Sequence, residues 1–159
     1  MDAATSAWAG GAGAELLSAA ALMTLTVLIH GSFVFLAAGW LEARLGRQAA
    51  RDVRPGMVER FALINTVVLL MLGAHLLEMA VWAGFFVVIG AVADPHRAFY
   101  FAAVTYTTLG YEDTKLPQGW QLLAPSLATA GVLMFGWTTG TLVTVVTALN
   151  AIRRRPRKD

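Results

Sequence analysis

Hydrophobic and polar positions divide the chain into three long apolar runs and one short run. Leu16–Leu41 and Pro117–Ile152 contain no charged residue over 26 and 36 positions, and Phe61–Ala93 contains only Glu78 in 33 positions. About 20 apolar residues cross a bilayer as a helix, so each long run is long enough to span it. The fourth uncharged run, Ala98–Tyr111, has only 14 residues, a length that predicts a re-entrant or buried segment.

This pattern predicts an all-α integral membrane protein with three transmembrane helices and a re-entrant helix between the second and the third. Asp94-Pro95 offers an N-cap followed by a proline at the first helical position, so a short helix is expected to start there. The expected segments are an N-terminal tail at 1–14, a transmembrane helix at 15–41, a basic loop at 42–60, a second helix at 61–93, a short helix at 95–107, a third helix at 120–152 and a basic tail at 153–159.

Composition and charge sharpen this picture. The chain is 57% hydrophobic and 14% charged, against roughly 25% charge in an average soluble domain, which argues against a soluble globular protein. The absence of cysteine excludes disulfides, thiolate metal sites and cysteine catalysis. Of the 12 basic residues, five lie between the first two apolar runs and five lie at the C-terminus.

The basic clusters predict the orientation of the chain. The positive-inside rule places residues 44–60 and the C-terminal tail in the cytoplasm, and the region before Leu16, which contains no Lys or Arg, outside. Three crossings satisfy this orientation only if the short run enters and leaves by the outer face. The acidic N-terminal stretch lacks the basic region of a signal peptide, so the first helix is expected to be retained in a plasma or inner membrane.

Four arginines, Arg44, Arg47, Arg51 and Arg54, are spaced to share one face of a helix that should end at Pro55-Gly56. One interpretation is an amphipathic segment that contacts anionic lipid headgroups. The other, which we favour, is an ordinary cytoplasmic loop that obeys the charge bias. In either case the basic excess is a topology pattern, and no nucleic-acid partner is expected.

The short run leads into the sequence Thr-Tyr-Thr-Thr-Leu-Gly-Tyr-Glu-Asp at 105–113. This segment resembles the selectivity filter of potassium channels, whose signature is Thr-Val-Gly-Tyr-Gly. Its setting is similar as well, because an aromatic-rich segment precedes it and a proline and a glycine-containing apolar helix follow. The resemblance covers 61–152 as outer helix 61–93, pore helix 95–107, filter 108–112 and inner helix 120–152. The helix at 15–41 is an addition to the minimal two-helix pore module.

The resemblance implies a passive, potassium-selective channel in which backbone carbonyls replace the water shell of K⁺. One filter strand supplies a quarter of the coordinating ring, so the resemblance implies a homotetramer. It implies no enzymatic activity and no cofactor other than the permeant ion. The implied filter positions are Thr108, Leu109, Gly110, Tyr111 and Glu112. The implied supporting residues are Thr107, Asp113, Tyr100 and Phe101.

Two positions depart from the family signature. Leu109 replaces the usual valine or isoleucine, and Glu112 replaces the final glycine. Four Glu112 carboxylates would ring the outer mouth of a tetramer, where they would concentrate cations and bind divalent ions. A weakly selective or divalent-influenced cation channel is therefore the alternative. Val104 stands where some family members carry a glutamate that pairs with the aspartate after the filter, so that brace is missing here.

Glycines punctuate the third long run, and Gly136 and Gly140 have a G-x-x-x-G spacing. Gly131 and Gly136 are candidates for a gating hinge, with close helix packing as the equal alternative. Threonines of the same helix are candidates for its water-facing side: Thr129, Thr138, Thr141 and Thr144.

His30, His75 and Glu78 are the ionisable residues deep within the long runs, and such residues are functional candidates by default. Counting from the cytoplasmic arginines places both histidines at a similar depth, and His75 and Glu78 share a helix face. Three interpretations remain: a hydrogen-bonded cluster that ties the extra helix to the pore module, which we favour, a pH sensor, or ligands for a metal or haem. The haem interpretation makes the rival function a small haem- or metal-binding membrane protein with His30 and His75 as paired ligands.

Overall fold

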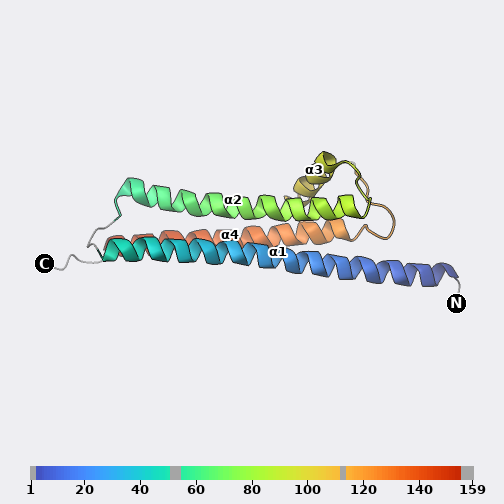
Figure 1. The fold of residues 1–159 in the computed structure, drawn as a ribbon, viewed down its shortest axis with the longest axis horizontal. Helices are drawn as coiled ribbons and strands as arrows, with labels where there is room; N and C mark the ends of the chain where they lie inside the picture. Colours follow the sequence, from blue (N-terminus) through green and yellow to red (C-terminus); the bar gives the residue numbers. More distant parts are fainter. Residues whose placement is uncertain (1–2, 51–54, 112–113, 155–159) are drawn as a thin grey trace.

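The computed structural model describes residues 3–50, 55–111 and 114–154 (Figure 1). These residues form four α-helices and no β-strand. Three helices are long, namely α1 (Ala3–Ala49), α2 (Met57–Val88) and α4 (Leu123–Arg154). The fourth, α3 (Pro95–Tyr106), has 12 residues and lies between α2 and α4 in the chain.

Three segments are long and apolar enough to cross a membrane, as the hydrophobic pattern predicts. They are Gly13–Ala49, Met57–Val88 and Leu123–Ile152. A helix rises about 1.5 Å per residue, so the shortest of them exceeds the ~30 Å of hydrocarbon in a bilayer. Large apolar side chains such as Leu17, Phe35 and Val88 remain exposed on the outside of the bundle, as expected for surfaces that face lipid.

The long helices lie alongside one another in an up-down-up arrangement (Figure 1). The beginning of α1 and the end of α4 are therefore at opposite ends of the bundle. The short helix α3 packs against α2 and α4 at the end where α2 finishes and α4 starts. This arrangement brings the segment after α3 back towards α4.

Helix α1 is longer than expected at both ends. Most of the expected tail at 1–14 and the first part of the expected loop at 42–60 belong to it. The reason is local, because residues 3–49 contain no proline and many alanines, and alanine has the best helix propensity. Arg44 and Arg47 therefore belong to α1. Arg51 and Arg54 lie outside the described residues.

Helix α2 ends before its apolar run ends at Ala93, and helix α4 starts after its apolar run begins at Pro117. Gly90 has a φ of 69° and follows the end of α2, where the N–H of Ala91 donates to the carbonyl of Phe86 at 3.0 Å. This is the left-handed glycine termination typical of helix C-termini. Helix α4 starts after a turn in which the N–H of Trp120 donates to the carbonyl of Pro117. Glu15 of α1 accepts a hydrogen bond from the N–H of Leu122, just before α4.

The buried apolar residues form two clusters at opposite ends of the bundle. One lies beside α3 and includes Trp82, Phe86 and Phe101. The other lies near the end of α1 and includes Met71 and Leu149. Between them lies a middle layer that holds the buried polar side chains of His30, His75 and Glu78.

Candidate functional site

The backbone after α3 folds back onto that helix. Thr107 is its C-cap residue, and the N–H groups of residues 107–110 donate to α3 carbonyls at 3.0–3.4 Å. No cis peptide occurs among the residues that the structure describes, and in a trans peptide the C=O points opposite to the N–H of the next residue. The carbonyls of residues 106–109 are therefore directed away from the body of α3.

Two residues of this segment have left-handed backbone conformations. Thr108 has a φ of 60° and Gly110 a φ of 67°. This conformation is accessible to glycine but costs a non-glycine residue roughly 1–2 kcal/mol. Strain of this kind concentrates at functional sites. The expected filter positions 108–111 are exposed in the single chain, and Glu112 and Asp113 lie outside the described residues.

The end of α3 lies directly against α4 at Gly131. A Cβ atom built on Gly131 would lie 2.0 Å from the carbonyl oxygen of Tyr106 and 3.1 Å from its Cγ. A side chain at this position would therefore force α3 and α4 apart. Gly136 differs, because a Cβ there would meet nothing within 4 Å. Close packing accounts for Gly131, while the hinge role of Gly136 stays a prediction.

The residues expected to support the filter lie on α3 or beside it. Phe101 is buried, and its ring lies 5.3 Å from that of Phe86 in an edge-on arrangement. The hydroxyl of Thr107 donates to the carbonyl of Ala103 at 2.7 Å. Tyr100 is exposed on the single chain. The short helix is thus anchored by its aromatic face against α2.

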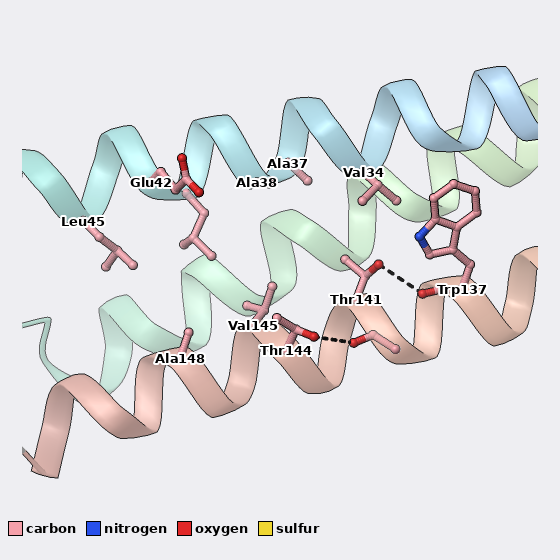
Figure 2. Close-up of a pocket in the computed structure, with 12 residues that line it drawn as sticks. Val34, Ala37, Ala38, Glu42, Leu45, Trp137, Thr141, Thr144, Val145 and Ala148 are labelled. Carbon is pink, nitrogen blue, oxygen red and sulfur yellow. Dashed lines mark hydrogen bonds between the residues drawn. The ribbon is translucent and has the colours of Figure 1, made fainter.

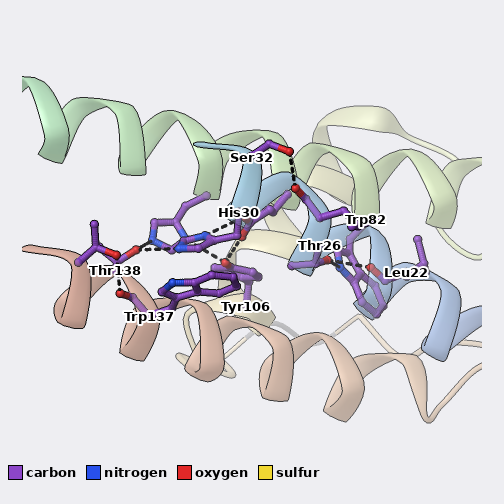
Figure 3. Close-up of polar contacts among 12 residues, drawn as sticks. Leu22, Thr26, His30, Ser32, Trp82, Tyr106, Trp137 and Thr138 are labelled. Carbon is purple, nitrogen blue, oxygen red and sulfur yellow. Dashed lines mark hydrogen bonds and ion pairs between the residues drawn. The ribbon is translucent and has the colours of Figure 1, made fainter. Parts of the chain in front are cut away.

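Five polar side chains in the middle layer form a closed ring of hydrogen-bond contacts, which we call the polar ring (Figure 3). All four helices contribute to it. In order around the ring, its members are Glu78 and His30, then Thr138, then His75, then Tyr106, which returns to Glu78.

Each member of the polar ring uses two contacts. Oε1 of Glu78 lies 3.0 Å from Nδ1 of His30, and Oε2 accepts from the Tyr106 hydroxyl. That hydroxyl also lies 2.9 Å from Nδ1 of His75. Oγ1 of Thr138 lies 3.0 Å from Nε2 of His75 and 3.3 Å from Nε2 of His30. The structure therefore brings together the three ionisable residues identified in the sequence and adds Tyr106 and Thr138 to them.

Four of the five members of the polar ring are buried, and Thr138 is half-buried. His30, Glu78 and Tyr106 are 0% exposed and His75 is 6% exposed. Aromatic side chains of α4 cover the imidazoles, with the ring of Trp137 5.4 Å from His30 and that of Phe135 4.8 Å from His75. A buried charge or an unpaired polar group lowers stability in such surroundings. These side chains therefore need their hydrogen-bond partners in order to remain buried.

The geometry also bears on a metal or haem at this cluster. One ligand-type atom from each of His30, His75 and Glu78 falls within 4.8 Å of the others. All four imidazole nitrogens, however, already have polar partners. A metal or haem iron would have to replace these contacts, whereas the hydrogen-bonded cluster needs no change in the structure.

Contacts at the far end of the bundle join α1 to α2. Arg44 pairs with Glu59, their Nη2 and Oε1 atoms 3.0 Å apart, and Gln48 donates to the same carboxylate. Arg47 is exposed. Arg44 is thus engaged within the protein, and contact of the basic segment with anionic lipid stays a prediction.

A groove of about 570 Å³ separates α1 from α4 towards the same end (Figure 2). Its lining is mostly apolar, with the indole of Trp137 at one end. Thr141 and Thr144 also line it, but their hydroxyls donate to carbonyls of α4 one turn earlier. Both threonines therefore face α1 in the single chain, and their polar atoms are already satisfied.

Sequence reasoning missed part of this site. Tyr106 reads as one more aromatic residue of the short helix, and Thr138 as one of several threonines on α4. Periodicity cannot reveal that both hydroxyls meet His75, because three separate helices must first pack. Glu15 was also missed, although an isolated acid at the start of an apolar run is a signal that it caps something nearby.

Comparison with known proteins identifies the segment that contains most of this geometry. The sequence profile of a family described as "Ion channel" matches residues 74–148, from the second half of α2 through α3 to α4. No match was found among curated proteins or among solved structures. Residues 74–148 therefore match an ion channel domain, consistent with a pore module of the potassium-channel type.

Proposed function

We propose that this protein is a homotetrameric cation channel that conducts K⁺ passively through a carbonyl-lined filter at residues 108–112. The observation that carries the proposal is the non-helical segment after α3, which lies in the chain between two helices long and apolar enough to span a membrane, within the residues that match an ion channel domain. The proposal assigns α2 as the outer helix, α3 as the pore helix and α4 as the inner helix.

The length of α3 supports a re-entrant path. Its 12 residues rise about 18 Å, well short of the ~30 Å hydrocarbon core. Non-helical backbone at membrane depth must lie against protein or line a water-filled path, because lipid cannot satisfy its N–H and C=O groups. The last residue of α3, Tyr106, contacts α4 at Gly131, and the residues from 108 onwards are exposed.

The electrostatics of the segment suit a cation. Carbonyls of residues 106–109 continue in the direction of the α3 C-terminus, which carries the negative end of the helix dipole. Backbone carbonyls are the ligands that replace the hydration shell of K⁺ in a selectivity filter. One chain supplies one strand, so a complete ring of carbonyls requires four copies around a common axis.

Substitution of Glu112 distinguishes a potassium-selective pore from a weakly selective one. We expect Glu112→Gly to raise the K⁺/Na⁺ flux ratio or to weaken block by Ca²⁺, because it removes four carboxylates from the outer mouth. The measurement is flux of K⁺, Na⁺ and Ca²⁺ into liposomes that contain the wild type or the variant. Glu112→Gln is the matched control that removes the charge and keeps the side chain.

The outcomes of this experiment are distinct. K⁺ flux that exceeds Na⁺ flux supports the selective channel, and equal fluxes with Ca²⁺ block support the alternative. Unchanged selectivity and unchanged block in both variants would refute a role of Glu112 in permeation. No flux of any cation from a tetrameric preparation would refute the channel itself. A Soret band in the purified protein would instead support the haem-binding rival.

A further inference from the structure

The contacts of the polar ring require a definite number of hydrogens. It contains five contacts, and each needs one hydrogen between its two heavy atoms. Tyr106 and Thr138 have one hydroxyl hydrogen each, and a neutral imidazole has one N–H, so two hydroxyls and two neutral histidines supply four. An ionised Glu78 supplies none. The closed ring therefore requires one proton beyond those of a carboxylate and two neutral imidazoles.

We propose that the polar ring is a proton-binding site and that its one exchangeable proton ties α1 to α4. With that proton, every contact has a hydrogen and the ring has no net charge. This holds whether the proton resides on Glu78 or on an imidazole. Burial favours the neutral assembly, since an isolated charge in this layer would be strongly destabilised.

Loss of the proton opens the ring at a defined place. The ionised Glu78 keeps both of its donors, His30 and Tyr106, because hydrogen bonds to a charged acceptor are the strongest in the ring. The contact left without a hydrogen then falls at Thr138, whose single hydroxyl hydrogen can reach only one imidazole. The longer of its two contacts, 3.3 Å to His30, is the one that opens.

This contact has a particular place in the molecule. His30 lies on α1, outside the ion channel domain, whereas Thr138 lies on α4 within it. The proton thus connects the additional helix to the helix that would line the pore. Neither His30 nor Thr138 is part of the segment after α3. Their role in the proposal is to position α1 against α4.

The titratable groups that face the ring are its own members. Helix α1 contributes His30, α2 contributes His75 and Glu78, and α3 contributes Tyr106. Helix α4 contributes Thr138 together with two uncharged aromatic side chains. Within the described part of the chain, the ion pair of Arg44 and Glu59 lies at the far end of the bundle. In the proposal, the exchangeable proton is therefore shared among the members of the ring.

The test is the pH dependence of the melting temperature, Tm, of the full chain in detergent. We expect the Tm of the wild type to fall by roughly 2–4 °C from acid to alkaline pH, since the closed form exists only while the proton is bound. Glu78→Gln should have a nearly constant Tm, because its amide both donates and accepts and so closes the ring without an extra proton. A wild-type slope retained in Glu78→Gln would overturn the proposal.

A second pair of variants keeps the proposal testable if Glu78→Gln does not fold. Thr138→Val removes the hydroxyl and should flatten the pH profile, with a Tm below that of the wild type at acid pH. Thr138→Ser keeps the hydroxyl and should restore the wild-type profile. A sloping profile for Thr138→Val, or a flat one for the wild type, would contradict the proposed proton site.

A matched control lies nearby. Trp82 donates to the hydroxyl of Thr26 at 2.9 Å, which is another buried contact between α1 and α2 but outside the ring. Thr26→Val should lower the Tm and keep the wild-type dependence of Tm on pH. A flattened dependence would show that the loss of any buried polar contact has this effect, and it would overturn the assignment of the proton to the polar ring. Because Tm requires no ion conduction, failure of the flux assay would bear on the proposed function and not on this inference.

Discussion

At the scale of single residues, the contact between Gly131 and Tyr106 sets the distance between α3 and α4. We predict that Gly131→Ala destabilises the protein by about 1–3 kcal/mol, the usual cost of an extra methyl group in a closely packed site. The new Cβ would lie 2.0 Å from the Tyr106 carbonyl oxygen, so the end of α3 must shift as well. Thermal unfolding and K⁺ flux would both report the change.

Gly136→Ala is the control for this prediction. It makes the same change in the same helix, but its Cβ meets nothing within 4 Å in the single chain. We expect its Tm to match or exceed that of the wild type, because alanine favours a helix interior over glycine. Equal loss of stability in the two variants would show that a general property of α4, and not its contact with α3, is responsible.

At the scale of elements, α3 depends on its N-terminal cap. Oδ1 of Asp94 accepts from the N–H of Arg97 at 2.7 Å, and Pro95 occupies the first turn. We predict that Asp94→Ala lowers stability by about 0.5–2 kcal/mol, the typical value of a lost cap. Asp94→Asn keeps the acceptor and should remain close to the wild type. Chemical unfolding of both variants checks this, and a stable Asp94→Ala would mean that α3 is held by packing alone.

The elements themselves show what the sequence could and could not reveal. The three candidate spans and the Asp94-Pro95 start of α3 were predictable, because length, apolar content and capping chemistry are local properties. The predicted tail at 1–14 and the predicted boundary at residue 41 were wrong, since one helix continues from Ala3 to Ala49 and joins the first apolar run to the helix expected around Arg44 and Arg47. Charge sets topology, but it does not stop a helix.

The candidate site also combines residues that the sequence reveals with residues that it does not reveal. His30, His75 and Glu78 were identifiable because ionisable residues are rare in apolar runs. Their partners Tyr106 and Thr138 were not, because hydroxyl side chains are common and only the packing of four helices brings these two to the imidazoles. The closed ring is a property of tertiary structure, so no spacing along the chain encodes it visibly.

At the scale of the whole molecule, three spans place the two basic regions at one end of the bundle and the turn between α3 and α4 at the other. Basic residues remain on the cytoplasmic side, so we predict that this turn faces outwards. The chain has no cysteine, which allows single reporters at exposed positions in two loops. Gln118→Cys lies before α4, and Ala50→Cys follows α1.

In intact cells, a membrane-impermeant maleimide should label Gln118→Cys and leave Ala50→Cys unlabelled until the membrane is permeabilised. The wild type, which lacks any thiol, measures the background. The reverse pattern would place the filter segment on the cytoplasmic side, and cations would then enter the channel from inside past Glu112. Labelling of both positions in intact cells would mean that the chain inserts in two orientations, which the strong bias of its arginines argues against.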